Sequence, residues 1–309
     1  MNFKVLGLVA LASLSFSIFS EPIVYGKLLL TFEFQDREAG RESNLVSNAS
    51  RVGVKGNINF TSSLKGIYQI EYEVDPVHGK ADKSRGRFFE QRDSFIGLKG
   101  SYGTLFLGKH TTAFKESQEK IDLFNNLAAD IKNLLQGENR MTDFVGYVTP
   151  TFGSGFSGTF NAVRSSEEFE GDNFGDHLSY SLNYKTKKFY ASIAIDSKIK
   201  GYDSTRYSFK IPIDVHQLGL IYQESKKIRS GIKEGGFVVS FQSKVGEKGT
   251  LKTQVSESDM KLVSGKQVTF GYDHKLSEEL KVFFFHTNLS TQVISKDKTI
   301  LSIGFEYNF

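Results

Sequence analysis

The sequence predicts an all-β fold, a transmembrane antiparallel β-barrel of sixteen strands, and three observations lead to it. Many segments alternate apolar with polar or small residues at period two, as strands with one apolar face do. Several approach the roughly ten residues that a tilted membrane strand requires. Their apolar faces carry aromatic residues toward the ends, where the membrane interfaces lie. A soluble β-sandwich would also alternate, but it does not need such segments.

The first segment, residues 1–20, is expected to be a cleaved secretory signal peptide. Lys4 precedes an almost unbroken apolar run at residues 5–19, which is too short for a membrane-spanning helix of about 20 residues. Cleavage after Ser20 would leave residues 21–309 as a single barrel domain. An uncleaved anchor is the alternative, but nothing extends the apolar run.

The composition excludes several classes of protein. The chain has no Cys, so no disulfide framework is possible. The formal net charge is +4 with both signs interspersed, which gives no basic stripe for nucleic acid. No later stretch approaches 18 apolar residues, so membrane-spanning helices are not expected.

Sixteen segments follow the period-two pattern, an even number, as bacterial single-chain barrels have. The last is the clearest: every second residue from Leu301 to Phe309 is apolar or aromatic, and the residues between are small or polar. Pro212 limits the pairing of the strand that precedes it. We expect strands at residues 23–35, 49–60, 64–74, 90–99, 103–109, 143–150, 155–163, 176–185, 188–196, 204–211, 215–223, 235–243, 249–256, 266–273, 279–287 and 299–309.

The joins between these strands alternate between short and long, as periplasmic turns and external loops do. Short, polar or Gly-rich joins are expected on the periplasmic side at residues 61–63, 100–102, 245–248 and 276–278. Long joins are expected outside at residues 36–48, 75–89, 164–175, 224–234 and 288–298.

One join, residues 110–142, is far longer than a usual hairpin loop. Between Asp122 and Gly137, apolar residues recur at helical spacing, at Leu123, Leu127, Ile131 and Leu134. The segment is either an external lid or the third external loop folded into the lumen, with a short amphipathic helix against the wall. A barrel of this strand number is wide enough to need such a filling if it is selective, so we expect inward folding.

Several motifs, taken in order, resemble those of the trimeric general porins of Gram-negative outer membranes, along essentially the whole mature length. They are Val24-Tyr25-Gly26-Lys27, residues 49–56, 66–72, 92–100, 103–105 and 108–109, Asn139-Arg140, and residues 147–150, 155–156 and 274–277. The resemblance implies a location in the cell outer membrane. It also implies a homotrimer in contact with outer-membrane lipid and lipopolysaccharide.

The resemblance further implies a pore constriction, in which basic residues of the wall face acidic residues of the inserted loop. Carried over by position, the wall supplies an arginine cluster, a nearby lysine and a carboxylate. The family's usual acidic loop element is missing here, so the loop acids are inferred from their place in the insert. The implied constriction residues are Lys27, Arg51, Glu71, Arg92 and Arg140 on the wall, with Asp122, Asp130 and Glu138 on the loop.

The period of the strands supports two of these positions independently. Val52 and its period-two neighbours are apolar and point outward, so Arg51 points to the lumen. Arg92 is opposite in phase to Phe95 and is also expected inside. The same phase points Asp93 outward, where a charge at mid-bilayer costs a few kcal/mol. The alternative for each arginine is an ordinary solvated wall residue.

The sequence shows no pattern of catalytic or metal-binding residues. The six His are scattered without a metal-ligand pair, and residues 153–155 suit a turn better than a nucleophile elbow. Ser179 and His177 share a phase, but both would face the lumen, whereas a barrel phospholipase needs them toward lipid. We therefore expect no enzyme, no cofactor and no metal.

The predicted function is a porin, a water-filled channel for passive diffusion of ions and small hydrophilic solutes. A substrate-specific channel for sugars or anions is an alternative, but it would present a row of inward aromatic residues, for which Tyr25 and Tyr190 are too few. An adhesin or receptor barrel would carry longer external loops than residues 288–298 provide.

Overall fold

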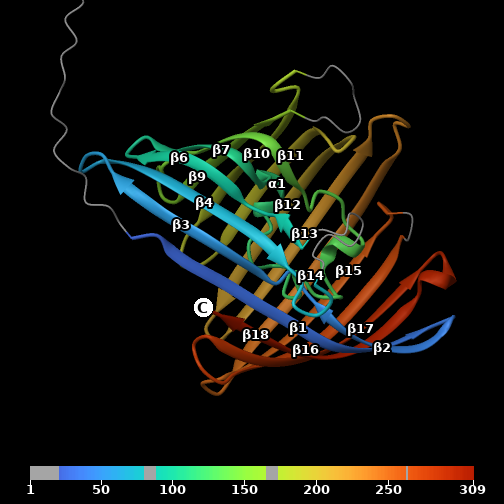
Figure 1. Ribbon diagram of the computed structural model, residues 1–309. Coiled ribbons are helices and arrows are strands. Elements are labelled where there is room, and N and C mark those ends of the chain that lie inside the picture. The colour runs from blue at the N-terminus through green and yellow to red at the C-terminus, as the bar shows by residue number, and fades with distance from the viewer. Residues whose placement is uncertain (1–20, 80–87, 165–172, 262–263) are drawn as a thin grey trace, which may run out of the picture.

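The computed structural model describes residues 21–79, 88–164, 173–261 and 264–309, which form one closed antiparallel β-barrel (Figure 1). The expected signal peptide lies outside the described residues. No helix in the described part is long and apolar enough to cross a membrane. The strands are β1 (Ile23–Arg37), β2 (Gly40–Ser47), β3 (Arg51–Asn59), β4 (Leu64–Val74), β5 (Phe89–Gln91), β6 (Ser94–Gly100), β7 (Gly103–Thr111), β8 (Arg140–Val148), β9 (Phe156–Val163), β10 (His177–Lys185), β11 (Tyr190–Ile199), β12 (Tyr202–Ile213), β13 (His216–Lys227), β14 (Lys233–Val245), β15 (Gly249–Ser258), β16 (Gly265–Lys275), β17 (Leu280–Thr291) and β18 (Lys298–Asn308).

The eighteen strand segments form sixteen barrel strands, because two of the strands are interrupted. β2 and β3 both pair with β1 and are separated at residues 48–50, where Ala49 has a φ of 55°. β5 and β6 both pair with β4 and are separated at residues 92–93. Counting each interrupted pair once gives 18 − 2 = 16, and the predicted number of strands is confirmed.

The barrel closes between its first and last strands. β1 and β18 pair from Lys27 with Asn308 to Arg37 with Lys298. Phe309 continues this ladder: its N–H donates to the Gly26 carbonyl at 3.1 Å, and its carbonyl accepts from the Gly26 N–H at 2.9 Å. Gly26 leaves room for the terminal ring, because a Cβ there would lie 2.2 Å from Phe309 Cζ. The predicted closure of the chain end against residues 23–35 is confirmed.

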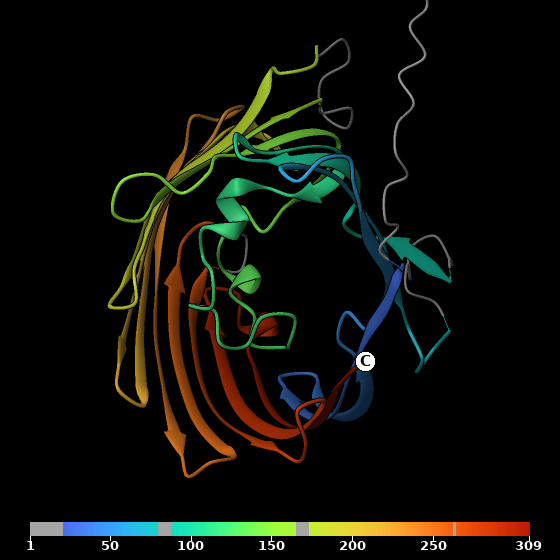
Figure 2. The same cartoon turned by 90° about the vertical axis from the view of Figure 1, so that its left-hand side faces the viewer.

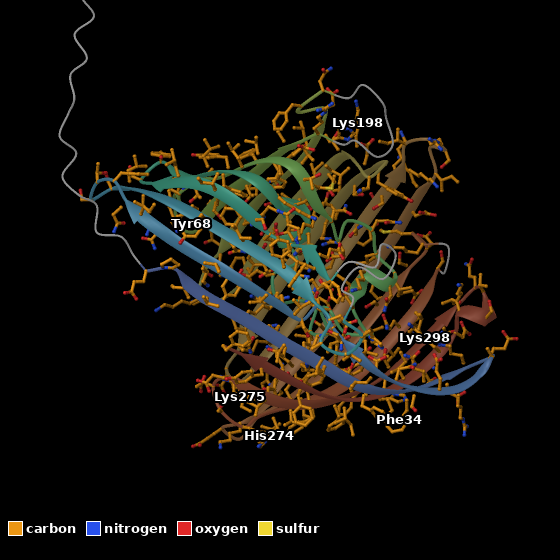
Figure 3. The ribbon with its side chains drawn as sticks, viewed as in Figure 1. Phe34, Tyr68, Lys198, His274, Lys275 and Lys298 are labelled. Carbon is orange, nitrogen blue, oxygen red and sulfur yellow. The ribbon has the colours of Figure 1, made fainter. Side chains whose placement is uncertain are left out.

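The outer wall is apolar, as the period-two pattern predicts. Along β18, Leu301 and its period-two neighbours through Tyr307 are exposed, while Ser302 between them is buried. Phe34 lies on the same outer surface at the end of β1 (Figure 3). In a membrane protein the exposed apolar face is the one that meets lipid, so the alternation reports which side of each strand is the lumen.

Three of the expected long joins are shorter than predicted, because the strands continue into them. β1 and β2 pair as far as Arg37 with Gly40 and leave only residues 38–39 between them. The joins expected at 224–234 and 288–298 shrink to residues 228–232 and 292–297. Main-chain hydrogen bonds between strands do not require an apolar face above the bilayer. The paired strands therefore extend beyond the residues that alternate in the sequence. The joins expected at 75–89 and 164–175 include residues outside the described ones.

The segment between β7 and β8 lies inside the ring of strands, as expected (Figure 2). It contains two single-turn helices, α1 (Ala113–Glu116) and η1 (Ile131–Asn133); a third, η2 (Ile294–Lys296), precedes β18. Its apolar side chains pack on inward-facing residues of the wall. One cluster joins Ile121, Ile131 and Leu135 to Ile221, Val238 and Met260, and another joins Phe124, Leu127 and Ala129 to Leu29, Phe283 and Phe285. These contacts hold the insert against β13, β14, β17 and β1.

The predicted amphipathic helix within the insert is wrong, although most of its apolar residues are buried. Asn126 has a φ of 67°, a left-handed conformation that interrupts a right-handed helix. The side chains of Asp122 and Asp130 accept hydrogen bonds from the N–H groups of Phe124 and Lys132. Such local side-chain acceptors compete with the helical ladder and favour turns.

Candidate functional site

A basic cluster lines the lumen where β1, β3, β4 and β8 lie, at the points where strands begin or are interrupted. Arg51 opens β3 directly after the first interruption, Arg92 lies in the second, and Arg140 opens β8. Arg51 is within electrostatic range of both other arginines. The structure therefore brings together the three arginines that the sequence implied.

Glu71 is the carboxylate at the centre of this cluster. Arg92 Nε lies 2.7 Å and Arg51 Nε 3.7 Å from its oxygens. The Tyr25 hydroxyl donates to the same carboxylate at 3.0 Å. Gly53 makes this possible, because a Cβ there would meet the Tyr25 ring at 2.6 Å. Glu71 thus holds two guanidinium groups on the wall, with a tyrosine as third donor.

Arg92 and Arg140 each have a second carboxylate on the wall. Arg92 Nη1 lies 2.6 Å from Glu73, the cross-strand neighbour of Arg51. Arg140 donates to both oxygens of Asp93, from Nε at 2.8 Å and from Nη2 at 3.4 Å. Charge-assisted pairs of this kind fix the planes of the guanidinium groups.

The expectation that Asp93 points outward is wrong. Asp93 lies in the interruption between β5 and β6, and it bonds to Arg140 and to the Thr111 N–H on the lumen side. The phase assumed for this strand was displaced by one residue, because the interruption shifts the register. Ile96 is the exposed outer residue, whereas Phe95 packs inside on Phe106 at 5.3 Å between ring centroids.

Lys27 extends the charged wall toward the last strands. Its ammonium lies 3.1 Å from Glu306, which Lys281 also reaches at 3.4 Å. Lys281 in turn lies 3.1 Å from Asp273, and Lys252 reaches that carboxylate at 2.8 Å. Opposite charges thus alternate around the inner wall from β1 to β15.

The loop acids lie elsewhere than the sequence implied. The side chains of Asp122 and Asp130 are buried, so the expectation that they face the arginines across the lumen is wrong. Asp122 accepts from Gln254 on β15 at 3.1 Å and from the Phe124 N–H at 3.1 Å. Asp130 accepts from the N–H groups of Asn126 and Lys132. Both carboxylates organise the turns of the insert.

Burial has a chemical consequence for the insert. Desolvation, with a smaller contribution from the charge of Asp130, raises the pKa of Asp122 to about 7. A carboxyl group with such a pKa is partly protonated at neutral pH, so it contributes less negative charge to the lumen than an ordinary aspartate does. Lys132, by contrast, is exposed on the insert.

Glu138 also turns away from the arginine cluster. It lies 3.0 Å from Arg206 Nη1 on β12 and 3.7 Å from the ammonium of Lys115. Its partner Arg206 is fully buried. The third loop acid therefore belongs to the contact between the insert and the wall.

Residues that hold the insert were missed by the sequence reasoning. Arg206, Lys252 and Gln254 all project inward and contact main-chain atoms of the insert. Their phase was available: Tyr207 and its period-two neighbours are the apolar outer residues of β12, so Arg206 had to point inward. The Ser179 hydroxyl, which faces the lumen side as expected, accepts from the Phe114 N–H at 3.1 Å.

The arrangement suits passage of solutes through water. The inner wall presents ion pairs and hydroxyl groups, which keep a water column in place. The basic groups of Arg51 and Arg140 remain about a fifth exposed, so they act on ions in that water. In the described residues, no group of three or more metal-ligating side chains occurs.

Comparison with known proteins gives a consistent family. The family model for the Gram-negative porins matches residues 6–308. The chain is 24% identical over 261 residues to outer membrane porin protein 32 of Delftia acidovorans, covering 77% of this chain and 73% of that protein. It is 28% identical over 199 residues to the major outer membrane protein P.IA of Neisseria meningitidis serogroup B, covering 63% of this chain but only 42% of that protein.

Solved structures share the fold. An anion-selective porin from Comamonas acidovorans has a TM-score of 0.75 at 18% identity, with 94% of this chain and 99% of that chain covered. OmpF of Salmonella typhi, in complex with daunomycin, has a TM-score of 0.74 at 15% identity, with 95% and 100% covered. At these identities the likeness concerns the arrangement of the strands.

Proposed function

Because the chain belongs to the Gram-negative porin family, we propose a mechanism for how it selects solutes. The protein is an outer-membrane porin, a water-filled channel for passive diffusion of ions and small hydrophilic solutes. The family's members are channels, and we propose that this chain likewise carries out no chemical reaction. Residues 1–20 act in this proposal as the export signal and are removed.

We propose that the channel favours anions, and one observation carries this. Asp122, Asp130 and Glu138 of the insert are withdrawn into turns and loop–wall contacts, while Arg51 and Arg140 stay about a fifth exposed on the wall beside their own carboxylates. The lumen therefore lacks the loop acids that would have faced the arginine cluster. The insert, residues 110–142, narrows the passage, and Lys132, whose ammonium lies 3.6 Å from Asp130, is exposed on it. The structural likeness to an anion-selective porin agrees with this preference.

We propose further that three copies associate through the wall around β3–β9. An apolar groove of about 280 Å³ runs on this outer surface, lined among others by Phe60, Ile96 and Leu107. β7–β9 have only eight or nine residues, at the lower limit of what a tilted strand needs to cross the hydrocarbon. Small outward residues, Gly158 and Ala162, suit close packing of a second subunit.

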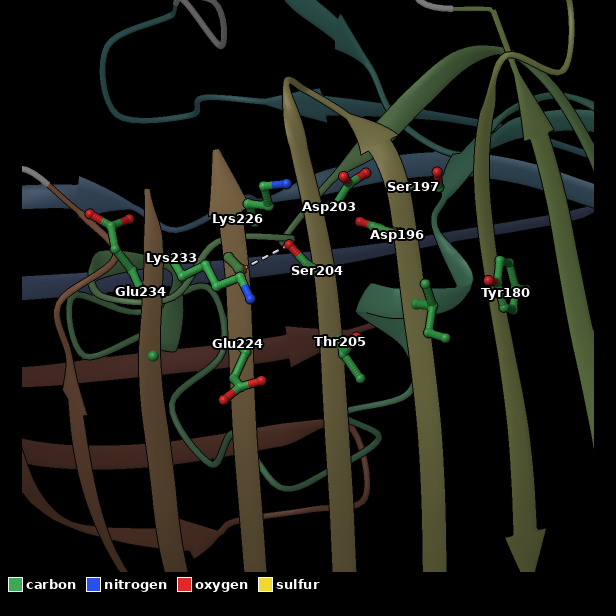
Figure 4. A pocket seen from close by; sticks show the side chains of 13 residues that line it. Tyr180, Asp196, Ser197, Asp203, Ser204, Thr205, Glu224, Lys226, Lys233 and Glu234 are labelled. Carbon is green, nitrogen blue, oxygen red and sulfur yellow. Dashed lines mark hydrogen bonds between the residues drawn. The ribbon is translucent and has the colours of Figure 1, made fainter. Parts of the chain in front are cut away.

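Lipopolysaccharide is the lipid partner that we propose for the opposite side. A groove of about 510 Å³ lies on the outer wall near the external ends of β12–β14, and its lining includes Lys226 and Lys233 together with the carboxylates of Asp196, Asp203, Glu224 and Glu234 (Figure 4). Nearer the membrane, Tyr207 and Tyr222 stack at 6.4 Å, as aromatic residues of an interface do. The two ammonium groups thus lie at the level of phosphorylated lipid headgroups.

Replacing Lys226 and Lys233 together by Gln should lower the phosphate that co-purifies with the protein, because two ammonium partners of the headgroup are lost. Phosphate per protein chain, measured after mild extraction, reports the effect. Exchange of Lys187 and Lys188, on the periplasmic turn, is the matched control. Equal phosphate in all three proteins would rule out this groove as the lipid site.

The proposed channel is tested on the unheated protein in mild detergent. Light scattering should give the mass of three chains, and N-terminal sequencing should begin near Glu21. In planar bilayers, we expect conductance steps in groups of three. Under a KCl gradient, the sign of the reversal potential should show that chloride is more permeant than potassium. Absence of conductance would contradict the channel, and a monomer mass would contradict the trimer. A reversal potential showing that potassium is more permeant than chloride would contradict the anion preference.

A further inference from the structure

We propose that Arg206 is the positioning residue that holds the inserted loop across the lumen and so sets the width of the constriction. Arg206 lies on β12, whereas the arginine cluster lies on β3, on β8 and in the interruption between β5 and β6. Among the described residues it is the largest side chain that is fully buried. This inference rests on the proposed channel only in its conductance measurements.

The guanidinium group contacts both ends of the insert at once. Nη1 donates to the Phe114 carbonyl at 3.4 Å, near the start of the insert. Nη2 donates to the Gln136 carbonyl at 3.1 Å, near its end. Nη1 also lies 3.0 Å from the carboxylate of Glu138. One side chain of the wall therefore ties the outgoing and the returning part of the loop together.

Further contacts make this a built arrangement. The Arg206 guanidinium carbon lies 4.4 Å from the centroid of the Phe114 ring, as in a cation–π pair. Its Nε donates at 2.9 Å to Gln223, its cross-strand partner on β13. Gln223 then donates to the same Gln136 carbonyl at 3.0 Å. Arg206 and Gln223, which are hydrogen-bonded to each other, thus both donate to the Gln136 carbonyl of the loop.

The neck of the insert is shaped to meet this contact. The Thr112 N–H donates to the Asn139 carbonyl at 3.2 Å and draws the two ends together. Gly137 has a φ of 89°, and a Cβ there would meet the Phe114 ring at 2.4 Å. Glycine therefore allows the Phe114 ring to pack on the returning chain, beside Arg206.

The position of β12 in the ring explains why this contact governs the pore. The insert leaves the wall at the end of β7 and returns at β8, and β9, β10 and β11 separate β8 from β12. A contact with β12 must therefore draw the loop sideways across the interior, as Figure 2 shows for the green segment. Without Arg206 the buried carboxylate of Glu138 would keep only Lys115 at 3.7 Å, a weak substitute.

The test measures access to the neck. Because the chain has no Cys, Ser117→Cys places a single thiol at a buried site, directly after α1, with little change in volume. In the otherwise unchanged protein we expect slow labelling by a charged methanethiosulfonate. Adding Arg206→Met should accelerate labelling at least about tenfold, the equivalent of one lost charge-assisted hydrogen bond. Single-channel traces of this variant should show broader, fluctuating conductance.

Arg51→Met in the same Ser117→Cys protein is the matched control, since it also removes an arginine from the inner wall. Because the side chain of Arg206 is fully buried under the insert, whereas that of Arg51 is about a fifth exposed to the lumen, the two variants should behave in opposite ways. Arg206→Met should change labelling and leave the reversal potential near its original value, and Arg51→Met should do the reverse.

Arg206→Lys decides the matter if Arg206→Met does not assemble. Lysine keeps the charge but lacks the fork that reaches both carbonyls, so it should give labelling between the two extremes. Labelling as slow as in the parent, in an assembled Arg206→Met or Arg206→Lys protein, would overturn the proposal. This result would not depend on conductance, so it can be told apart from a failure of the proposed channel.

Discussion

Replacing Arg51, Arg92 and Arg140 together by Ala should move the ion preference toward cations, with conductance unchanged or higher. A unit charge about 7 Å from an ion in water contributes roughly 0.6 kcal/mol, so each arginine lost should change the local concentration of anions and of cations about threefold each, in opposite directions, at low salt. The wall carboxylates that these arginines neutralise, Glu71 and Asp93, would also be released. Reversal potentials in a salt gradient measure the shift.

The effect should shrink near 1 M salt, where the screening length falls to about 3 Å. A suitable control removes three exposed arginines away from the cluster, by Arg41→Ala, Arg164→Ala and Arg229→Ala. A reversal potential that ignores the first triple change, or responds equally to the control, would refute the constriction residues and leave the fold untouched.

Deleting Phe309 should strongly reduce the amount of assembled barrel in the outer membrane. The deletion removes two hydrogen bonds with Gly26, each of about 1 kcal/mol, which together correspond to about thirtyfold in an equilibrium. It also removes the ring that covers Gly26 and stacks on Tyr307 at 6.0 Å. In porins a terminal aromatic residue is also expected to be read by the assembly machinery.

Heat-modifiable protein in outer-membrane fractions, compared on gels with and without boiling, reports this assembly. Phe309→Tyr keeps the ring and both main-chain bonds and should assemble normally. Asn308→Ala tests whether any change near the chain end has the same effect. If the chain without Phe309 assembles as well as the parent, then neither the contacts of Phe309 with Gly26 nor a terminal aromatic signal is needed for assembly.

The loop acids show where an inference from position in the chain misleads. Asp122, Asp130 and Glu138 have the charge and the location in the chain that a constriction requires. Their side chains instead accept hydrogen bonds from main-chain N–H groups and from wall residues. Position along an insert does not determine the direction of a side chain, because turns, unlike strands, have no fixed period.

The strand interruptions limited the sequence reasoning in a similar way. Ala49 and Asp93 each lie where one barrel strand is divided into two segments. A single irregular residue exchanges the inner and outer faces of all that follow in the strand, which is why Phe95 was placed on the wrong side. Arg92 still reached the lumen, because the interruption itself turned it inward.

The sequence by itself determined the barrel: the number of strands, the faces of the uninterrupted strands and the closing aromatic residue. These follow from a period of two, since burial against lipid demands the same alternation in every strand. The arginines of the wall were implied by the resemblance of the motifs that contain them. The path of the insert was decided only by the tertiary structure. Arg206 and Glu138 are 68 residues apart, and their contact exists only because ring closure brings β12 opposite the neck of the loop.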